Sequence, residues 1–520
     1  MISRRALLKG LVGAGFLTGA PWIWTPWKST VQAAYIRKAF IGAEGYGART
    51  SGWRDPNAQI LFVTNLNDNG PGSFRQAFQG STGPRYIIFQ VGGYIPSGSS
   101  FLSNEQHGGA RVYVAGQTAP GDGVGFKGAD TSGQNRSGLF IRNGETCVRY
   151  IRSRNNDATG TNSWAFGIWN ADTTDFMTNV IVDHCSFSYA SDDNIATTPA
   201  DYLTIQYCLL HEGLPGHAIL VDVMGPGQQY TFHHNVIMHF CQRHPLFVGG
   251  NGEFHNNLIY NWGGLGVGTG GDFDCYYGYT STYDTINNYY KWGPTSVCGN
   301  QAGNDDPANG FEIQYGSLSG GGTLFLSGNK ALLPNTPHVA TPNTYTDVRA
   351  RTHISPTIIL VGARQLTPPV PVTIDDISTR TLADAWAASL LTKCGCIRPR
   401  RDAVDTLACA SYGNFTGNSS CHIEADTLYA LAHGGDAYGT LASGTPLHQS
   451  PSGMTASFRA RFGLNNTVAD ALSTSISASR GLGEDFQNLE WNLMEVAGDV
   501  NLGSGADTTP PAAPTGVQIR

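Results

Sequence analysis

The middle part of the chain alternates short hydrophobic runs with polar turns, and the runs resemble one another. Each run begins with a β-branched or aromatic residue and passes into His, Asn, Tyr or Cys, and successive copies are about 22 to 34 residues apart. Short β-rich units at such a period are typical of a solenoid whose coils consist of strands and turns. The copies begin at Val148, Val182, Ile205, Phe232, Phe254 and Ile286.

Stacked coils place equivalent residues above one another, so identical side chains are expected to form ladders. Asn235, Asn257 and Asn288 occupy equivalent positions in three copies. Amide side chains at a bend can satisfy backbone groups that the bend leaves unpaired. We therefore predict an internal asparagine ladder that belongs to the scaffold.

Composition supports one long, turn-rich β domain. The 520 residues include 66 Gly and 26 Pro, and 14% are charged. This favours an all-β class over helices. The formal net charge is -7 and no long basic run occurs, which argues against nucleic acid as a partner.

The first residues have the pattern of an export signal. Residues 3–9 read SRRALLK, an apolar stretch follows to about residue 23, and small residues lie at 31–34. This resembles a twin-arginine signal, and it is too short and too Gly-rich for a membrane span. We predict a signal at 1–34 and a secreted or periplasmic protein without a membrane span.

The ten cysteines fall into groups with different expected roles. Four lie in apolar β-like runs and are expected to be buried as small hydrophobic residues: Cys147, Cys185, Cys208 and Cys241. Four lie in a polar tail, where disulfide bonds are expected in an exported protein: Cys394, Cys396, Cys409 and Cys421. The remaining Cys275 and Cys298 flank a Tyr-rich loop that a bond between them would fix.

Several segments in order carry a family resemblance. They are residues 43–48 (AEGYGA), 63–75 (VTNLNDNGPGSFR), 115–123 (AGQTAPGDG), 182–184 (VDH) and 401–405 (RDAVD). Over residues 38 to 405 the chain resembles pectate lyases of polysaccharide lyase family one, in a bacterial secreted branch. The resemblance implies a right-handed single-stranded parallel β-helix over 35–410 and, as we expect it, a monomer that cleaves an acidic polysaccharide, pectate by default.

Such lyases remove the proton next to a uronate carboxylate and expel the glycosidic oxygen, which requires a base and positive charge. The family's catalytic motif is an arginine, one residue and a proline, which matches Arg243-His244-Pro245. A substrate-binding lysine of the family falls near His217. The resemblance thus implies Arg243 as the base, with His217 as a second catalytic candidate.

Further side chains are expected to contact the substrate or a metal. The expected substrate contacts are Asp183, Trp164, His244 and Tyr277. The resemblance also implies calcium, although the family's ligand positions are only partly kept here, at Asp192, Asp193 and Asn162.

The tail and the activity leave alternatives open. Residues 411–505 are expected to form a disulfide-containing extension with a degenerate calcium-loop-like module, and 506–520 a Pro-rich linker to a possible further domain. The same β-helix could instead carry a glycoside hydrolase, which needs two carboxylates, or a non-catalytic polysaccharide-binding protein. Asp183, Asp192, Asp193 and Asp222 are the candidate carboxylates.

Overall fold

The computed structural model describes most of the chain between residues 37 and 503. The described residues are 37–96, 102–103, 110–127, 139–154, 164–168, 177–190, 192–198, 200–213, 217–222, 228–240, 243–261, 275–277, 281–291, 293, 312–315, 323–332, 345–347, 349–352, 358–360, 363–413, 439–480 and 486–503. The predicted signal and the Pro-rich linker lie outside them, and the predicted domain boundaries therefore stay predictions.

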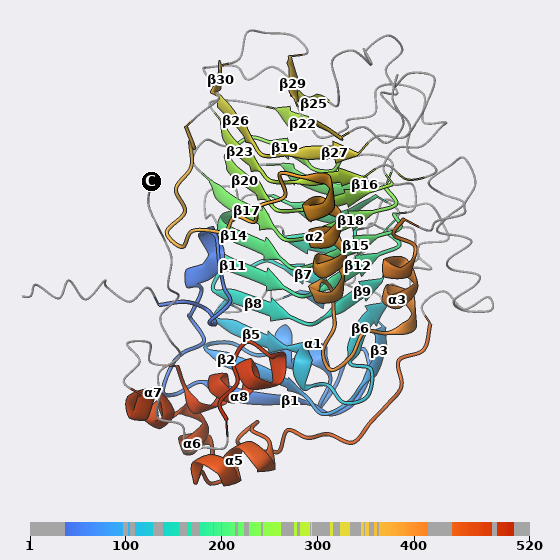
Figure 1. Ribbon diagram of the computed structural model, residues 1–520. Coiled ribbons are helices and arrows are strands. Elements are labelled where there is room, and N and C mark those ends of the chain that lie inside the picture. Colours follow the sequence, from blue (N-terminus) through green and yellow to red (C-terminus); the bar gives the residue numbers. More distant parts are fainter. Residues whose placement is uncertain are drawn as a thin grey trace, which may run out of the picture. The chain divides into compact units, whose positions relative to one another are not determined.

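The described strands form three sheets in which, with one antiparallel exception at β28, neighbours run parallel (Figure 1). Over most of each sheet, a strand pairs with the strands that lie three places before and three places after it in chain order. This is because each coil contributes one strand to each sheet. Crossovers between parallel strands are almost always right-handed. The predicted right-handed parallel β-helix is confirmed.

The 11-stranded sheet contains β1 (Gln59–Val63), β2 (Arg85–Phe89), β5 (Val112–Ala115), β8 (Thr146–Arg149), β11 (Met177–Asp183), β14 (Ala200–Gln206), β17 (Gln229–His233), β20 (Asn251–His255), β23 (Thr282–Ile286), β26 (Thr323–Ser327) and β30 (Ile358–Leu360). The 9-stranded sheet contains β4 (Leu102–Ser103), β7 (Leu139–Ile141), β10 (Phe166–Ile168), β13 (Asp193–Thr197), β16 (His217–Asp222), β19 (Leu246–Val248), β22 (Cys275–Tyr277), β25 (Glu312–Tyr315) and β29 (Arg349–Thr352). The 10-stranded sheet contains β3 (Gly93–Pro96), β6 (Val124–Lys127), β9 (Arg152–Arg154), β12 (Ser186–Ser188), β15 (Leu209–His211), β18 (Val236–Met238), β21 (Leu258–Tyr260), β24 (Tyr289–Lys291), β27 (Lys330–Leu332) and β28 (Tyr345–Asp347).

The repeated runs of the sequence are the strands of the 11-stranded sheet, and their register separates two rows of side chains. One row is apolar and fully buried in the core: Val148, Val182, Ile205, Phe232 and Phe254. The next residue of each strand points to the other face, because side chains alternate along a strand. This second row is polar: Arg149, Asp183, Gln206, His233 and His255.

The predicted asparagine ladder is confirmed and has a fourth member. The Nδ2 atoms of Asn235, Asn257 and Asn288 each donate to the Oδ1 atom of the next asparagine, at 3.0, 3.0 and 2.9 Å, and Asn329 ends the series. All four side chains are buried. Each buried amide therefore has partners, which avoids the cost of about 1–3 kcal/mol for an unsatisfied polar group.

Helices cover parts of the strand stack. They are η1 (Tyr46–Arg49), α1 (Phe74–Phe78), η2 (Gly116–Thr118), α2 (Arg380–Lys393), α3 (Ala403–Ala410), α5 (Ala456–Phe462), α6 (Val468–Leu472), α7 (Ser475–Arg480) and α8 (Asn488–Ala497). Helix α2 lies along the stacked strands of the 10-stranded sheet (Figure 1). Its residues Ala383, Ala387 and Leu390 pack against apolar side chains of that sheet. The helices after residue 455 share one apolar cluster with the first coils, as in the contact of Leu489 and Trp491 with that cluster.

The cysteines differ in part from the expectation. Cys147, Cys185 and Cys208 are buried, as predicted. Three cysteines of the tail, Cys394, Cys396 and Cys409, are free thiols and form no bridge with one another. The first two are buried against the β-helix, so packing takes the place that we assigned to disulfides. The predictions for Cys421, Cys241, Cys298 and the side chain of Cys275 fall outside the described residues.

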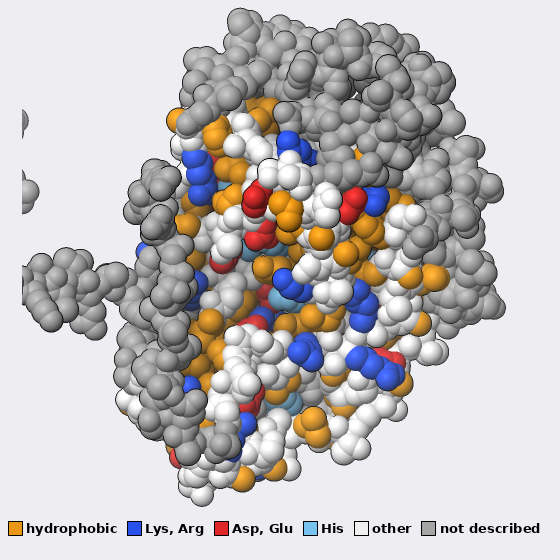
Figure 2. Space-filling model, viewed as in Figure 1, with side chains coloured by type: hydrophobic (Ala, Val, Ile, Leu, Met, Phe, Trp, Pro, Cys, Tyr) orange, Lys and Arg blue, Asp and Glu red, His pale blue; other side chains and the backbone are white. Residues whose placement is uncertain are grey.

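The distribution of charged side chains on the surface and the hydropathy of the described helices agree with the amino-acid composition. On the face shown in Figure 2, basic and acidic side chains are interspersed, without one continuous field of either sign. Within the described part of the chain, we find no helix that is long and apolar enough to cross a membrane.

Candidate active site

One edge of the 9-stranded sheet brings together residues from four coils. Asp192 and Asp193 lie at the start of β13, and His217 is the first residue of β16, paired in register with Asp193. Trp164 lies just before β10 and Arg243 shortly before β19. Parallel strands start at the same edge of a sheet, and so these side chains meet. We call Asp192, Asp193, His217 and Arg243 the edge cluster.

A buried ion pair fixes Arg243 in the edge cluster. Its Nη1 atom donates to Oδ1 and Oδ2 of Asp193, at 2.9 and 2.7 Å. The Asp193 side chain is 1% exposed, whereas that of Arg243 is 22% exposed. Burial raises the pKa of Asp193 to about 6 although the Arg243 guanidinium opposes this rise. Asp193 thus anchors a cation that still reaches solvent.

Asp192 orients the imidazole ring of His217. Its Oδ1 atom lies 3.1 Å from Nδ1 of His217, and its Oδ2 atom accepts a hydrogen bond from Nε1 of Trp164 at 3.2 Å. Burial alone would raise the pKa of Asp192, but these hydrogen bonds outweigh it and the pKa is lowered. With Nδ1–H donating to an ionised carboxylate, a neutral His217 carries its lone pair on Nε2. Such a nitrogen can accept a proton.

The backbone at Arg243 is held in an unusual conformation. Its φ is 64°, in the left-handed region that residues other than glycine seldom adopt. The Arg243 carbonyl accepts a hydrogen bond from the Ile219 amide of β16 at 2.8 Å. The same left-handed conformation recurs at other coil turns, with φ of 51° at His184 and 53° at His234, so it does not by itself mark a functional residue.

Asp183 lies elsewhere, which corrects its predicted contact with substrate. It belongs to the outward polar row of the 11-stranded sheet and is fully buried. Nε of Arg149 and Nε2 of Gln206 each donate to it at 2.7 Å. Burial would raise the pKa of Asp183, but the Arg149 guanidinium and these hydrogen bonds lower it. This carboxylate is part of the scaffold.

His244 also faces inward, contrary to the predicted substrate contact. Its side chain is 1% exposed, and Nε2 lies 3.0 Å from the Phe240 carbonyl oxygen. Burial lowers the pKa of His244 to about 3, so the ring is neutral at physiological pH. His244 therefore fastens the loop that carries Arg243.

Two predictions cannot be followed to side chains. Tyr277, which we placed in a loop, has its backbone in strand β22, two strands beyond β16 in the same sheet. The loop assignment was wrong there, but the Tyr277 side chain and the whole of Asn162 lie outside the described residues.

The described residues alone do not form a calcium shell. Calcium takes about six to eight oxygen ligands, and the edge cluster offers the carboxylates of Asp192 and Asp193. Their oxygens already accept hydrogen bonds or ion pairs from Arg243, His217 and Trp164. An imidazole is a poor ligand for calcium. Oxygens from elsewhere would be needed to complete such a site.

The sequence analysis did not identify two further sets of side chains that could bind a metal ion. Glu44 lies with His233 and His234, and Glu253 lies with His255 and Asp284, each set close enough to share an ion. Glu253 and His255 lie two residues apart on strand β20, but Asp284 comes from the next coil, in β23, and Glu44 from the segment before η1. The strand register and the fold of the N-terminal segment were needed to bring these sets together.

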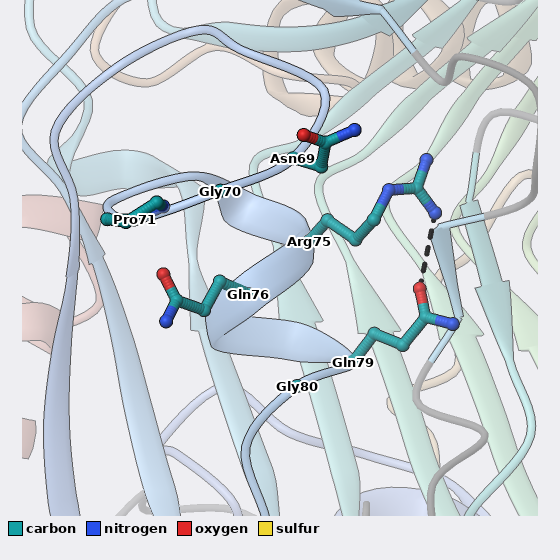
Figure 3. A pocket seen from close by; sticks show the side chains of 7 residues that line it. All are labelled: Asn69, Gly70, Pro71, Arg75, Gln76, Gln79 and Gly80. Atoms are coloured by element: carbon teal, nitrogen blue, oxygen red, sulfur yellow. Dashed lines mark hydrogen bonds between the residues drawn. The ribbon is translucent and has the colours of Figure 1, made fainter.

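A separate hollow lies near the first coil (Figure 3). Asn69, Gln76 and Gln79 line it together with Arg75, whose guanidinium pairs with Asp68. Its volume is about 430 Å³. Within the hollow Arg75 is the only charged lining residue, and it is already paired with a carboxylate. The hollow has no base and is not the predicted site.

Comparisons with known proteins point to one family. No family model matches the chain. A probable pectate lyase C of Aspergillus fumigatus is 33% identical over 314 residues, which cover 57% of this chain and 68% of the relative. A probable pectate lyase C of Aspergillus flavus is 35% identical over 288 residues, covering 55% and 62%.

Solved structures of similar proteins include a pectate lyase from Bacillus sp. N165 in complex with trigalacturonate. It has a TM-score of 0.39 and 17% identity, and the match covers 68% of this chain and 98% of that one. Pectate lyase C from Erwinia chrysanthemi, at pH 9.5 with 30 mM Ca²⁺, has a TM-score of 0.35 and 16% identity, covering 66% and 95%.

Proposed function

The chain belongs to the pectate lyase family, and on that premise we propose that it cleaves pectate by β-elimination at the edge cluster. One observation supports the edge cluster as the place of cleavage. Asp192, His217 and Arg243 combine an anchored cation with an oriented imidazole, and the three side chains are each 21–22% exposed at one sheet edge. Positive charge and a proton acceptor are the two requirements of the reaction.

The proposed roles follow the geometry. The proton next to the uronate carboxylate leaves as a double bond forms and the glycosidic oxygen departs. As the sequence resemblance implies, we propose Arg243 as the base. Its guanidinium must first release a proton, because only the neutral form can accept one, and Asp193 holds the group in place. His217, oriented by Asp192, is the second candidate to accept the proton or to bind the sugar carboxylate.

The finer points belong to the same proposal. We propose an acidic polysaccharide as the partner, a monomeric enzyme, and a bacterial protein exported by the twin-arginine signal at residues 1–34; the curated relatives named above are Aspergillus proteins. We also propose calcium as a cofactor, bound at a weak site. Oxygen atoms outside Asp192 and Asp193 complete its set of ligands.

The test is an assay of polygalacturonate cleavage with and without calcium, followed by the absorbance of the unsaturated product. The proposal expects this product from the wild-type chain and its loss in Arg243→Ala. New reducing ends without absorbance would indicate a hydrolase instead. Binding of polygalacturonate without either signal would indicate a non-catalytic binding protein.

A further inference from the structure

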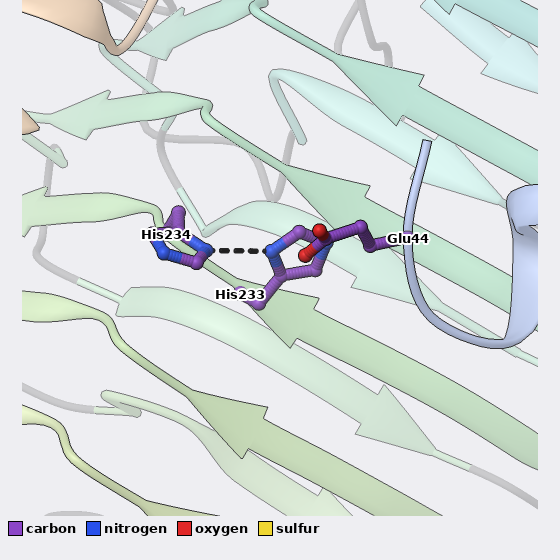
Figure 4. Close-up of side chains that lie close together, drawn as sticks. All are labelled: Glu44, His233 and His234. Carbon is purple, nitrogen blue, oxygen red and sulfur yellow. Dashed lines mark hydrogen bonds between the residues drawn. The ribbon is translucent and has the colours of Figure 1, made fainter. Parts of the chain in front are cut away.

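Two adjacent histidines meet a glutamate at the 11-stranded sheet, whereas the edge cluster lies at the 9-stranded sheet. His233 ends strand β17, and His234 follows it with a φ of 53°. Glu44 reaches them from the segment before η1 (Figure 4). One ligand atom from each residue lies within 4.8 Å of the others.

The hydrogen-bond partners fix both imidazole rings. Nε2 of His234 lies 2.9 Å from Oδ2 of Asp375, an acceptor, so that nitrogen carries a proton. Nε2 of His233 lies 3.1 Å from Oε1 of Gln206, whose amide nitrogen donates to Asp183. The Gln206 oxygen is therefore an acceptor as well, and Nε2 of His233 also carries a proton.

In neutral rings with these tautomers, both Nδ1 atoms bear lone pairs, and the two atoms are 2.8 Å apart. Two lone pairs cannot face each other at that distance unless something positive lies between or beside them. His233 is fully buried. A buried neutral ring with its lone pair turned inward is a ready metal ligand.

We propose that Nδ1 of His233, Nδ1 of His234 and the carboxylate of Glu44 bind a divalent transition-metal ion of the zinc class. Two imidazoles and one carboxylate are a donor set that suits zinc or cobalt rather than calcium. A fourth position is left for water.

The surroundings have the form that metal-bound histidines usually have. Such rings donate their second nitrogen to a carboxylate or carbonyl group, as His234 does to Asp375 and His233 to Gln206. Asp375 is itself oriented by Nε1 of Trp386, at 2.8 Å. The carboxylates of Glu44 and Asp375 together would balance the charge of a divalent ion.

The ion would link the N-terminal segment and the segment around residues 373–375 to the coil that contains β17. Glu44 accepts hydrogen bonds from the amide and the hydroxyl of Thr373, at 2.9 and 2.7 Å. The N-terminal segment and the segment around 373–375 thus already meet at β17. Since a metal that binds only the folded state stabilises it, we expect a structural role for the ion.

The test is titration of the metal-free full chain with Co²⁺, followed by its visible absorption, and with Zn²⁺, followed by the thermal midpoint. We expect one Co²⁺ per chain and a midpoint that rises with Zn²⁺. Glu44→Gln keeps the shape of the side chain and should weaken Co²⁺ binding by about 10-fold or more. The matched control Glu145→Gln and the edge variant His217→Gln should leave that binding unchanged.

Two outcomes would overturn the site. One is binding of less than about a tenth of an equivalent of either metal, since a shared proton would then fill the gap between the rings. The other is Co²⁺ absorption that survives Glu44→Gln but disappears in His217→Gln. Should the Glu44→Gln variant misfold, anomalous diffraction from zinc-soaked wild-type crystals gives the answer, with a peak expected between the two Nδ1 atoms.

Discussion

Two clusters in this molecule each contain an arginine, a histidine and two aspartates, but they differ in access to solvent. The first is the edge cluster of Asp192, Asp193, His217 and Arg243. The second, which we call the sealed cluster, consists of Arg154, His211, Asp402 and Asp405. In the sealed cluster all four side chains are 0–2% exposed, whereas three of the four in the edge cluster are 21–22% exposed.

The sealed cluster connects distant parts of the chain. Arg154 donates to Asp402 at 2.6 Å and to Asp405 at 2.7 Å, and His211 lies 3.2 Å from Asp405. Both aspartates belong to the start of α3, and so these bonds hold that helix against the 10-stranded sheet. The comparison teaches that residue type alone does not distinguish the proposed site from the scaffold, whereas exposure to solvent does distinguish them.

The largest expected effect is on the sealed cluster. Asp405→Ala would leave Arg154 and His211 buried without one of their partners, and removing one member of a buried ion pair costs about 3–5 kcal/mol. We expect a loss of that size in the free energy of unfolding, measured by urea denaturation. A loss below about 1 kcal/mol would contradict the view that this cluster holds the fold.

Arg243→Ala should act on activity instead. Loss of the cation and proposed base should reduce kcat/KM on polygalacturonate by about 10²- to 10³-fold. The free energy of unfolding should change by less than it does in Asp405→Ala, because Arg243 reaches solvent and Asp193 can take up a proton. A variant that is as active as wild type would remove the edge cluster from the reaction.

The sealed cluster should also show in the pH dependence of stability. Burial would lower the pKa of His211, but the hydrogen bond to Asp405 and the nearby Glu212 carboxylate, whose Oε2 lies 3.7 Å from Nδ1, raise it to about 9. A raised pKa in the folded state gives stability that is complete below about pH 6.5 and lost as the pH rises through 9, about 3 kcal/mol in all. Denaturation at several pH values should show this loss in wild type and not in His211→Gln.

The smallest effect is expected at Trp164. Trp164→Phe removes one hydrogen bond to Asp192, worth about 0.5–1.5 kcal/mol, and so kcat/KM should fall by no more than about 10-fold. The loss should be larger than in Tyr202→Phe, a control at a half-exposed ring on another sheet. Equal values in the two variants would show that Asp192 needs no support from Trp164.

The sequence was sufficient for the coils and the asparagine ladder, because each depends on a short motif repeated along the coils. The members of the edge cluster came from the family resemblance; they lie together in the structure, and their role in catalysis stays a proposal. The sequence was insufficient where function depends on which sheet a strand joins. Asp183 belongs to a sequence motif that resembles a substrate-binding segment. In the structure, the alternation of side chains along its strand turns it toward Arg149, in the scaffold. The sealed cluster could not be foreseen, since Asp402 reaches Arg154 across 248 residues.

The most direct test of the edge cluster is a crystal structure of the His217→Ala variant with bound trigalacturonate. We predict a sugar carboxylate within hydrogen-bonding distance of the Arg243 guanidinium, with the chain of sugars passing over the starts of β13, β16 and β19. Trigalacturonate bound only elsewhere, for example in the hollow beside Arg75, would contradict the assignment of the edge cluster as the place of cleavage.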